Sequence, residues 1–340
     1  MQKNYVYKML LVFVSAMLLL AGCGGGSQTG PAKQEGAQDK PKEKLTIMLD
    51  WYPNAVHSFL YTAMKKGYFA EEGIDLDIQM PAETNDPLRM AAANKIDLAF
   101  TYQPAVAIAR SEGVPVKSIA AVVRHPLNVV LVPKNSSIHS PKDFAGKKIG
   151  YPSMPLDEVN IQTMMEKDGA DFKQAKMTDI GFDIISALAT NRVDAVIGGY
   201  KNHEQILLDK KGFPVRAINL SDYGVPDSSE LVIAASDKTI ADKKDLLARF
   251  WKAASKGQDY VLNHKQEGLG YLLANEKKEF PLEKDVEEKS LDILLPLMNE
   301  QGQSFGTQSA DQWTKVVEWL KKNKQVKPDV KPEDCFTALP

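Results

Sequence analysis

Residues 45–66 read LTIMLDWYPNAVHSFLYTAMKK, and this stretch decides the fold class. It opens with a short apolar run that is typical of a β-strand, and it closes, from Phe59 to Lys66, with apolar residues at helical spacing. A polar and aromatic loop, from Asp50 to His57, joins the two. A strand followed by a loop and a helix is typical of a sheet covered by helices, so the stretch predicts an α/β fold.

The same alternation continues along most of the chain. A first set of predicted strands (45–49, 76–79, 97–101, 119–123) and helices (59–66, 87–93, 104–111) forms one lobe. A second set of strands (129–132, 147–150, 176–180, 195–197) and helices (157–167, 183–190, 203–208) forms another. A strand at 230–234 then precedes helices expected to cover the first lobe, at 243–262, 266–274, 283–294 and 310–322.

The second lobe is predicted to be an insertion in the first. The chain crosses between the two sets of elements near residues 125–129 and again near 223–229. Lobe one is therefore expected to comprise residues 44–127 plus 229–340, and lobe two residues 128–228. Two adjacent crossing segments form a natural hinge. Open α/β sheets bind ligands beyond the carboxyl ends of their strands, which predicts a binding cleft between the lobes.

The first 22 residues have the pattern of an export signal. Lys3 and Lys8 precede an apolar run that ends in Leu20-Ala21-Gly22-Cys23. This run is too short for a membrane-spanning helix, and its small terminal residues are typical of a cleaved lipoprotein signal. We predict a lipidated Cys23 and a flexible tether over residues 23–43, which would hold the folded part at the outer face of the cytoplasmic membrane.

Composition and motifs argue against several classes of protein. The net charge is −2 and Lys and Arg are spread along the chain, so the basic stripe that a nucleic-acid-binding protein needs is absent. Five scattered His and only two Cys, Cys23 and Cys335, predict neither a metal site nor a disulfide within the mature chain. No nucleophile elbow, phosphate loop or dinucleotide motif is present, so no cofactor is predicted.

The loop after the first predicted strand is the first candidate binding site. Trp51 offers a flat apolar face, while Asp50, Asn54 and His57 supply a carboxylate, an amide and an imidazole. This combination suits a small aromatic heterocycle. The alternative is that Asp50 or Asn54 caps the next helix and that Trp51 belongs to the core.

A second candidate loop, Gly198-Gly199-Tyr200-Lys201-Asn202-His203-Glu204, follows a strand of lobe two. The two glycines would let a ligand approach the backbone closely. Tyr200 is expected to stack on the ligand face opposite Trp51, and Glu204 to accept hydrogen bonds from an exocyclic amine. The alternative for Glu204 is a favourable charge in the first turn of a helix.

Two further loops complete the predicted cleft. Tyr151 lies in a loop that ends one strand and opens a helix, whose N-terminal amides would face the cleft. In the alternative interpretation this loop is an ordinary helix start with Asp157 as its N-cap. Tyr102 follows the strand at 97–101 and is the last predicted ligand contact.

These loops resemble those of the thiamine-pyrimidine-precursor family of substrate-binding proteins, an SsuA-like family with the two-lobed type II periplasmic-binding-protein fold. The resemblance runs through most of the mature chain. Its motifs are Leu49-Asp50-Trp51-x-Pro53-Asn54-x-x-His57, Lys66-Gly67-Tyr68-Phe69 and Gly199-Tyr200-x-Asn202-His203-Glu204, of which the second is the least specific.

The resemblance implies an aminopyrimidine held between Trp51 and Tyr200, with Asp50 and Glu204 on its amino side. The ligand implied is N-formyl-4-amino-5-aminomethyl-2-methylpyrimidine or a close aminopyrimidine. It would be delivered to the permease and ATPase subunits of an ABC importer for thiamine salvage, by a hinged protein that closes over its ligand.

Other functions stay open from the sequence. A binding protein for riboflavin or an alkanesulfonate is one alternative, although a sulfonate site would need Arg and helix N-termini in place of Asp50 and Glu204. An enzyme like the yeast precursor synthase, which has the same fold, is another, and His57 matches its active-site His. No cysteine lies between Cys23 and Cys335 to form that enzyme's cysteine-rich loop, so we expect a carrier and not an enzyme.

Overall fold

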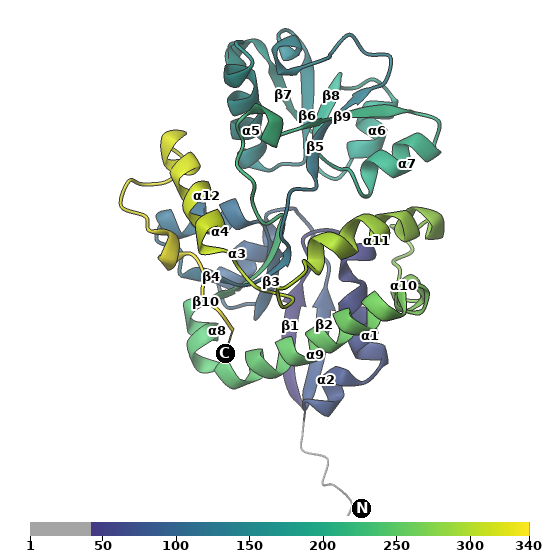
Figure 1. The fold of residues 1–340 in the computed structure, drawn as a ribbon, viewed down its shortest axis with the longest axis vertical. Coiled ribbons are helices and arrows are strands. Elements are labelled where there is room, and N and C mark those ends of the chain that lie inside the picture. Colours follow the sequence, from purple (N-terminus) through teal and green to yellow (C-terminus); the bar gives the residue numbers. More distant parts are fainter. Residues whose placement is uncertain (1–41, 340) are drawn as a thin grey trace, which may run out of the picture. The chain divides into compact units, whose positions relative to one another are not determined.

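The structure, a computed structural model, describes residues 42–339 (Figure 1). All of them belong to one unit of the chain, which starts at Lys40. The predicted export signal, Cys23 and nearly all of the predicted tether lie outside the described residues. Within residues 42–339, no helix is both long enough and apolar enough to cross a membrane.

The first lobe is built on a five-stranded sheet with the strand order β2-β1-β3-β10-β4. Its strands are β1 (Glu43–Met48), β2 (Ile74–Gln79), β3 (Leu98–Thr101), β4 (Val116–Val123) and β10 (Leu231–Ser236). β1 pairs in parallel with β2 and β3, whereas β10 is antiparallel to both β3 and β4. The last strand therefore enters the sheet between β3 and β4, after the chain has built the second lobe.

Helices cover both faces of this sheet. They are the 3-10 turn η1 (Ala55–His57), α1 (Ser58–Lys65), α2 (Tyr68–Glu71), α3 (Asp86–Ala92), α4 (Gln103–Ser111), α8 (Asp237–Asp242), α9 (Lys244–Asn263), α10 (Lys265–Leu273), α11 (Lys284–Met298), α12 (Ala310–Lys322) and η5 (Pro332–Asp334). The long helix α9 packs on α1 and α2, and α12 packs on α4 (Figure 1).

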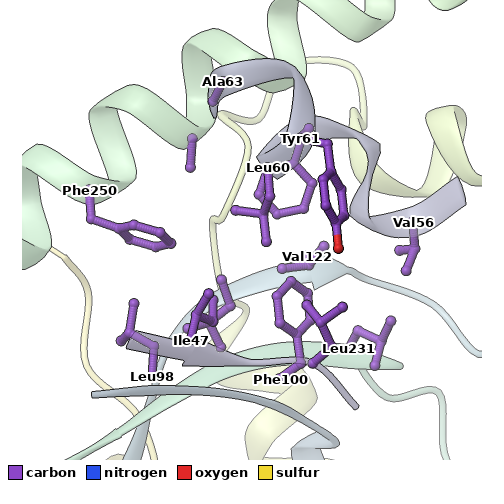
Figure 2. Packing of buried hydrophobic residues seen from close by; sticks show 14 of the residues in the cluster. Ile47, Val56, Leu60, Tyr61, Ala63, Leu98, Phe100, Val122, Leu231 and Phe250 are labelled. Atoms are coloured by element: carbon purple, nitrogen blue, oxygen red, sulfur yellow. The ribbon is translucent and has the colours of Figure 1, made fainter. Parts of the chain in front are cut away.

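The alternation of β10 explains why two apolar layers form. Leu231 and Ile233 belong to the core beneath α1 and α9, whereas Val232 belongs to the cluster beneath α4 and α12. Side chains of a strand point alternately to its two faces, so a fully apolar strand must be covered on both. Figure 2 shows the first layer, in which Leu60 and Phe250 lie over the sheet.

The second lobe is built on a separate five-stranded sheet with the order β7-β6-β8-β5-β9. Its elements are β5 (Asn128–Pro133), η2 (Pro141–Phe144), β6 (Lys148–Tyr151), α5 (Pro155–Lys167), η3 (Phe172–Gln174), β7 (Lys176–Asp179), α6 (Ile184–Ala189), β8 (Ala195–Tyr200), α7 (Glu204–Lys210), β9 (Val215–Asn219) and η4 (Ser221–Tyr223). β6 pairs in parallel with β7 and β8, and β5 is antiparallel to β8 and β9.

The predicted α/β class is confirmed, with differences at individual elements. Strand β9 was not predicted, because its sequence, VRAIN, interrupts the apolar pattern with Arg216, as an edge strand permits. Helix α11 continues beyond the predicted end at residue 294 to Met298, with Pro296 in its last turn. The lobe boundaries remain a prediction; β4 and β5, like β9 and β10, belong to different sheets.

Candidate functional site

A cavity of about 100 Å³ lies between the two sheets. The loop after β1 and the start of α4 line it from the first lobe, and the first turn of α5 and the end of β8 line it from the second. The two segments that cross between the sheets, around Pro126 and Pro226, complete the wall. The cavity therefore lies where strand ends of both lobes meet, as expected for a ligand site in open α/β sheets.

In the loop after β1, three predicted residues form one hydrogen-bonded group. The side-chain oxygen of Asn54 accepts from the backbone of Val56 (3.2 Å) and caps η1, so the predicted capping alternative is correct for Asn54. The backbone N–H of Asn54 donates to Nδ1 of His57 (3.3 Å). Nε2 of His57 is therefore the protonated nitrogen, and it donates to Oδ1 of Asp50 (3.1 Å). Asp50 and Asn54 line the cavity, whereas the fully buried His57 lies behind Asp50 and holds it in place.

Trp51 lies at the junction of the two lobes. Its ring packs against Phe182 of the second lobe, with the ring centroids 4.3 Å apart and the planes at 58°. It also contacts the apolar cluster of that lobe, which includes Leu188 and Val196. Because Trp51 lines the cavity as well, both predicted alternatives apply: the ring is part of a core and part of the site.

The glycines at the end of β8 have a packing role. Gly198 has a φ of +89°, and a Cβ atom there would lie 2.6 Å from the ring of Pro152. A Cβ atom at Gly199 would lie 2.4 Å from Leu131. Protein atoms thus occupy the space that a side chain would take at either residue. Gly198 nevertheless lines the cavity, whereas Gly199 does not, so close approach of a ligand to the backbone stays a prediction for Gly198 alone. The glycines let β8 pack closely and place Tyr200 at the cavity wall.

Tyr200 is hydrogen-bonded to a carboxylate that sequence reasoning missed. Its hydroxyl donates to Oε1 of Glu230 (2.9 Å), and Oε2 of Glu230 accepts from the backbone of Leu127 (2.6 Å) and Asn128 (2.9 Å). Glu230 thus ties the two crossing segments together. Burial raises the pKa of Glu230, and burial together with the charge of Glu230 raises the pKa of Tyr200 well above its usual value.

Glu204 begins α7 and is bonded to its own loop. Its Oε2 accepts from the backbone N–H of Tyr200 (2.9 Å), and its Oε1 lies 2.9 Å from Nδ1 of His203. Burial alone would raise the pKa of Glu204, but the charge of His203 and these hydrogen bonds lower it. Glu204 therefore presents an ionised carboxylate to the cavity.

The other nitrogen of His203 reaches the first lobe. Nε2 lies 3.1 Å from Oε1 of Glu287 in α11, and Oε2 of Glu287 accepts from the backbone of Ala55 (2.7 Å). Burial alone would lower the pKa of His203, but the charge of Glu204 and the hydrogen bonds to both carboxylates raise it well above its usual value. His203 is therefore an imidazolium that donates from both nitrogens.

Asp157 is not the N-cap of its helix, because α5 begins at Pro155 and Met154 takes the cap position. Asp157 lies instead within the first turn, with its side chain buried at the cavity wall. Its Oδ1 accepts from the amides of Asn128 (3.3 Å) and Asn160 (3.4 Å). Burial raises the pKa of Asp157 to about 7.

The structure brings most of the predicted ligand contacts to one cavity, but not all. Tyr151 does not line the cavity, because its ring packs against the core of the second lobe, as Phe172 does. His57 does not line it either. The predicted residues that do line it are Asp50, Trp51, Asn54, Tyr102, Tyr200 and Glu204.

The cavity wall is acidic and aromatic. The carboxyl groups of Asp50, Asp157, Glu204 and Glu230 line it, and among the described residues no Lys or Arg does. Such a wall favours a ligand with hydrogen-bond donors and a flat ring, and it disfavours an anion. Among residues 42–339, no group of three or more His, Cys, Asp or Glu is placed to hold a metal ion.

Comparisons with known proteins agree with this fold. Residues 54–268 match the family described as NMT1/THI5 like. The formylaminopyrimidine-binding protein of Halalkalibacterium halodurans is 40% identical over 97% of this chain and 98% of its own length. The 4-amino-5-hydroxymethyl-2-methylpyrimidine phosphate synthase THI5 of Saccharomyces cerevisiae is 26% identical over 65% of this chain and 67% of its own length.

A solved structure shows the same architecture. The alkanesulfonate-binding protein SsuA from Xanthomonas axonopodis pv. citri superposes with a TM-score of 0.68 at 15% identity, covering 89% of this chain and all of that one (100%). This likeness confirms the predicted two-lobed periplasmic-binding-protein fold. With the family match over residues 54–268 and the 40% identity above, this chain belongs to the NMT1/THI5-like family.

Proposed function

We propose that this chain is the substrate-binding component of an ABC importer and that it binds N-formyl-4-amino-5-aminomethyl-2-methylpyrimidine or a close aminopyrimidine for thiamine salvage. The observation that carries the proposal is the joint placement of two aromatic rings, Trp51 and Tyr200, and two buried carboxyl groups, Asp50 and Glu204, on one cavity. An aminopyrimidine has a flat ring and an exocyclic amine that match these groups. The similarity to a formylaminopyrimidine-binding protein over nearly the whole chain supports the same ligand class.

Each lobe contributes one ring and one carboxylate to the proposed site. Trp51 and Asp50 come from the loop after β1, and Tyr200 and Glu204 from the end of β8 and the start of α7. A ligand that contacts both pairs favours the closed arrangement of the lobes, because only that arrangement completes its contacts. Asp157 adds a carboxyl group whose pKa burial raises to about 7, and in its protonated form it can donate to a carbonyl oxygen.

We infer that the chain is a carrier and not an enzyme. The family contains synthases as well as binding proteins, but the match to the yeast synthase covers 67% of that enzyme, whereas the match to the binding protein covers 98% of it. No cysteine lies between Cys23 and Cys335 to form the cysteine-rich loop that the synthase resemblance would require.

We also propose that the carrier is a lipoprotein, anchored through Cys23 at the outer face of the cytoplasmic membrane, with the permease and ATPase subunits of the importer as partners. The apolar run before Cys23 and the polar segment after it support this location. Metabolic labelling with a tritiated fatty acid should label the protein, and Cys23→Ser should abolish the label and release the protein from the membrane fraction. Equal labelling of both forms would refute the anchor.

Calorimetric titration tests the ligand. The purified protein is titrated with the formylaminopyrimidine, hydroxymethylpyrimidine, thiamine, riboflavin and taurine. Tight aminopyrimidine binding is expected, with a loss of at least tenfold in Trp51→Ala and in Glu204→Gln. Phe213→Ala and Glu318→Gln replace the same kinds of residue at exposed positions and should leave the affinity unchanged. Binding of riboflavin or taurine alone would contradict the proposal and assign the chain to another importer class.

A further inference from the structure

A continuous chain of hydrogen bonds joins the two lobes beside the cavity. It runs from the backbone N–H of Ala55 to Glu287 (2.7 Å), from Glu287 to His203 (3.1 Å), and from His203 to Glu204 (2.9 Å). Ala55 follows the loop that carries Trp51, and Glu204 is on the wall of the other lobe. We call these four residues the His203 relay.

We propose that His203 is a positioning residue, which orients the Glu204 carboxylate for the ligand and, through Glu287, couples that carboxylate to closure of the two lobes. The orienting part of this proposal rests on the proposed function, because it takes Glu204 as a ligand contact. The coupling to closure does not depend on the identity of the ligand.

The arrangement requires a residue with two donors at position 203. Glu204 and Glu287 are both buried, and Glu287 is 0% exposed. Two buried carboxylates that face one another would repel, but an imidazolium between them gives each a charge-assisted hydrogen bond. If the lobes separate, Glu287 loses this partner while the Ala55 N–H remains. Separation of the lobes thus breaks an ion pair that is shielded from water in the closed form.

The relay differs from the other ion pairs between the lobes on this side of the cavity. A second buried contact beside it, the hydrogen bond from the amide of Asn202 to the hydroxyl of Ser290 (2.9 Å), carries no charge. Lys210 pairs with Glu283 (2.7 Å) and with Asp285, but these side chains are about one-third to one-half exposed. Exposed ion pairs contribute little to stability and are screened by salt. The His203 side chain is 8% exposed and that of Glu287 1% exposed, so among these ion pairs this is the one whose loss should weaken closure.

Three titratable groups face the imidazole of His203. They are Glu204 at the start of α7, Glu287 in α11 and the phenol of Tyr52 in the loop after β1, whose ring centroid lies 5.9 Å from that of His203. The nearby Glu283 and Asp285, at the start of α11, are paired with Lys210 and Lys211, so these four groups together contribute little net charge.

The coupling predicts how closure depends on pH. His203 gains Glu287 on closure, so its pKa is higher in the closed form, where it lies well above the ordinary value. Closure therefore takes up a proton. The stabilisation is complete below the open-form pKa, and it is lost as the pH rises through the raised closed-form pKa.

The test compares His203→Gln, Glu287→Gln and the double variant with the unaltered protein, by calorimetric titration with the formylaminopyrimidine between pH 6 and pH 9. Each single variant should bind the formylaminopyrimidine about tenfold or more weakly at pH 6.5. Because both substitutions break the same pair, the affinity of the double variant should be no lower than that of the single variant that binds less tightly. The decline in affinity toward pH 9 should be much shallower in His203→Gln, because this variant lacks the imidazole that titrates. Titration of the ligand itself affects both proteins equally, so it cancels in the comparison with the unaltered protein. Lys210→Gln, which removes exposed contacts between the same helices, should change affinity less than threefold.

Small-angle X-ray scattering of the ligand-free protein provides a second measurement. The unaltered protein should be more compact at pH 6 than at pH 9, and His203→Gln should show no such difference. Additive losses in the double variant with an unchanged pH profile would overturn the coupling. If no aminopyrimidine binds the unaltered protein, the proposed function fails and scattering alone decides the coupling: a pH-dependent size lost in His203→Gln supports it, and a pH-independent size overturns it.

Discussion

The hydroxyl of Tyr200 donates a hydrogen bond of 2.9 Å to Glu230, which joins the end of a strand in one lobe to the segment that leads back into the other. The same tyrosine ring lines the cavity. A single side chain thus has two separable functions, since its ring contacts the cavity and its hydroxyl satisfies a buried carboxylate.

Replacing Tyr200 by Phe should separate these functions. The ring stays, so affinity for an aminopyrimidine should fall less than threefold, but Glu230 loses one donor and the free energy of unfolding should drop by about 1–2 kcal/mol. Tyr200→Ala removes the ring as well and should weaken binding tenfold or more. Urea unfolding and calorimetry measure the two effects, and equal affinity losses in both variants would show that the hydroxyl, not the ring, matters for binding.

Asp157→Asn should stabilise the ligand-free protein at high pH. The pKa of this buried carboxyl is raised from 3.8 to about 7, so the folded state holds a proton that the unfolded state has released between these values. Wild-type stability therefore falls as the pH rises through this window, by up to about 1.4 kcal/mol per pKa unit. An amide carries no such penalty and still accepts from Asn128 and Asn160.

The expected gain from Asp157→Asn is small at pH 4.5 and on the order of 2 kcal/mol at pH 8. Urea unfolding at the two pH values measures it. Asp329→Asn removes an exposed carboxylate and should show no comparable difference between the two pH values. A pH-independent effect of Asp157→Asn would mean that the carboxyl is not protonated in the folded state.

The sequence predicts the parts of the site that follow from strand ends. Asp50 and Tyr200 come directly after or at the end of apolar strands, and such residues in adjacent lobes converge on one cleft. Which of the neighbouring side chains face the cavity depends on the backbone conformation of each loop, which the sequence pattern does not specify. His57 lies one turn away from Asn54 and is turned inward, and Tyr151 is directed to the core of its own lobe.

Residues that act through long-range pairing could not be found in this way. Glu287 lies in an amphipathic helix and is separated by 84 residues from His203 and by 232 from Ala55. Nothing in the local pattern distinguishes it from its neighbour Glu288, whose side chain is 31% exposed. Glu230 did carry a signal, because a carboxylate at the edge of a fully apolar strand must find buried donors.

Gly257→Ala and Gly270→Ala should have opposite effects on stability. Both glycines lie inside helices, where alanine is favoured by about 0.5–1 kcal/mol. A Cβ atom at Gly257 would lie 2.3 Å from the carbonyl oxygen of Phe59, where α9 packs on α1, whereas nothing lies within 4 Å at Gly270. Thermal unfolding should show a loss of about 1–3 kcal/mol for Gly257→Ala and a small gain for Gly270→Ala. Gains in both would mean that α9 can move away from α1 without cost.

Gly198→Ala should reduce both stability and ligand affinity, and Gly212→Ala serves as its matched control. The two glycines have similar positive φ values, +89° and +80°, so alanine strains the backbone about equally at both. Only at Gly198 would the new Cβ atom collide with Pro152, 2.6 Å away. Relief of that contact must shift β8 and with it Tyr200, so Gly198→Ala should weaken aminopyrimidine binding about tenfold beyond the control. Equal losses of stability and affinity in the two variants would mean that backbone strain causes the whole effect. The close contact between Gly198 and Pro152 would then have no role in placing Tyr200.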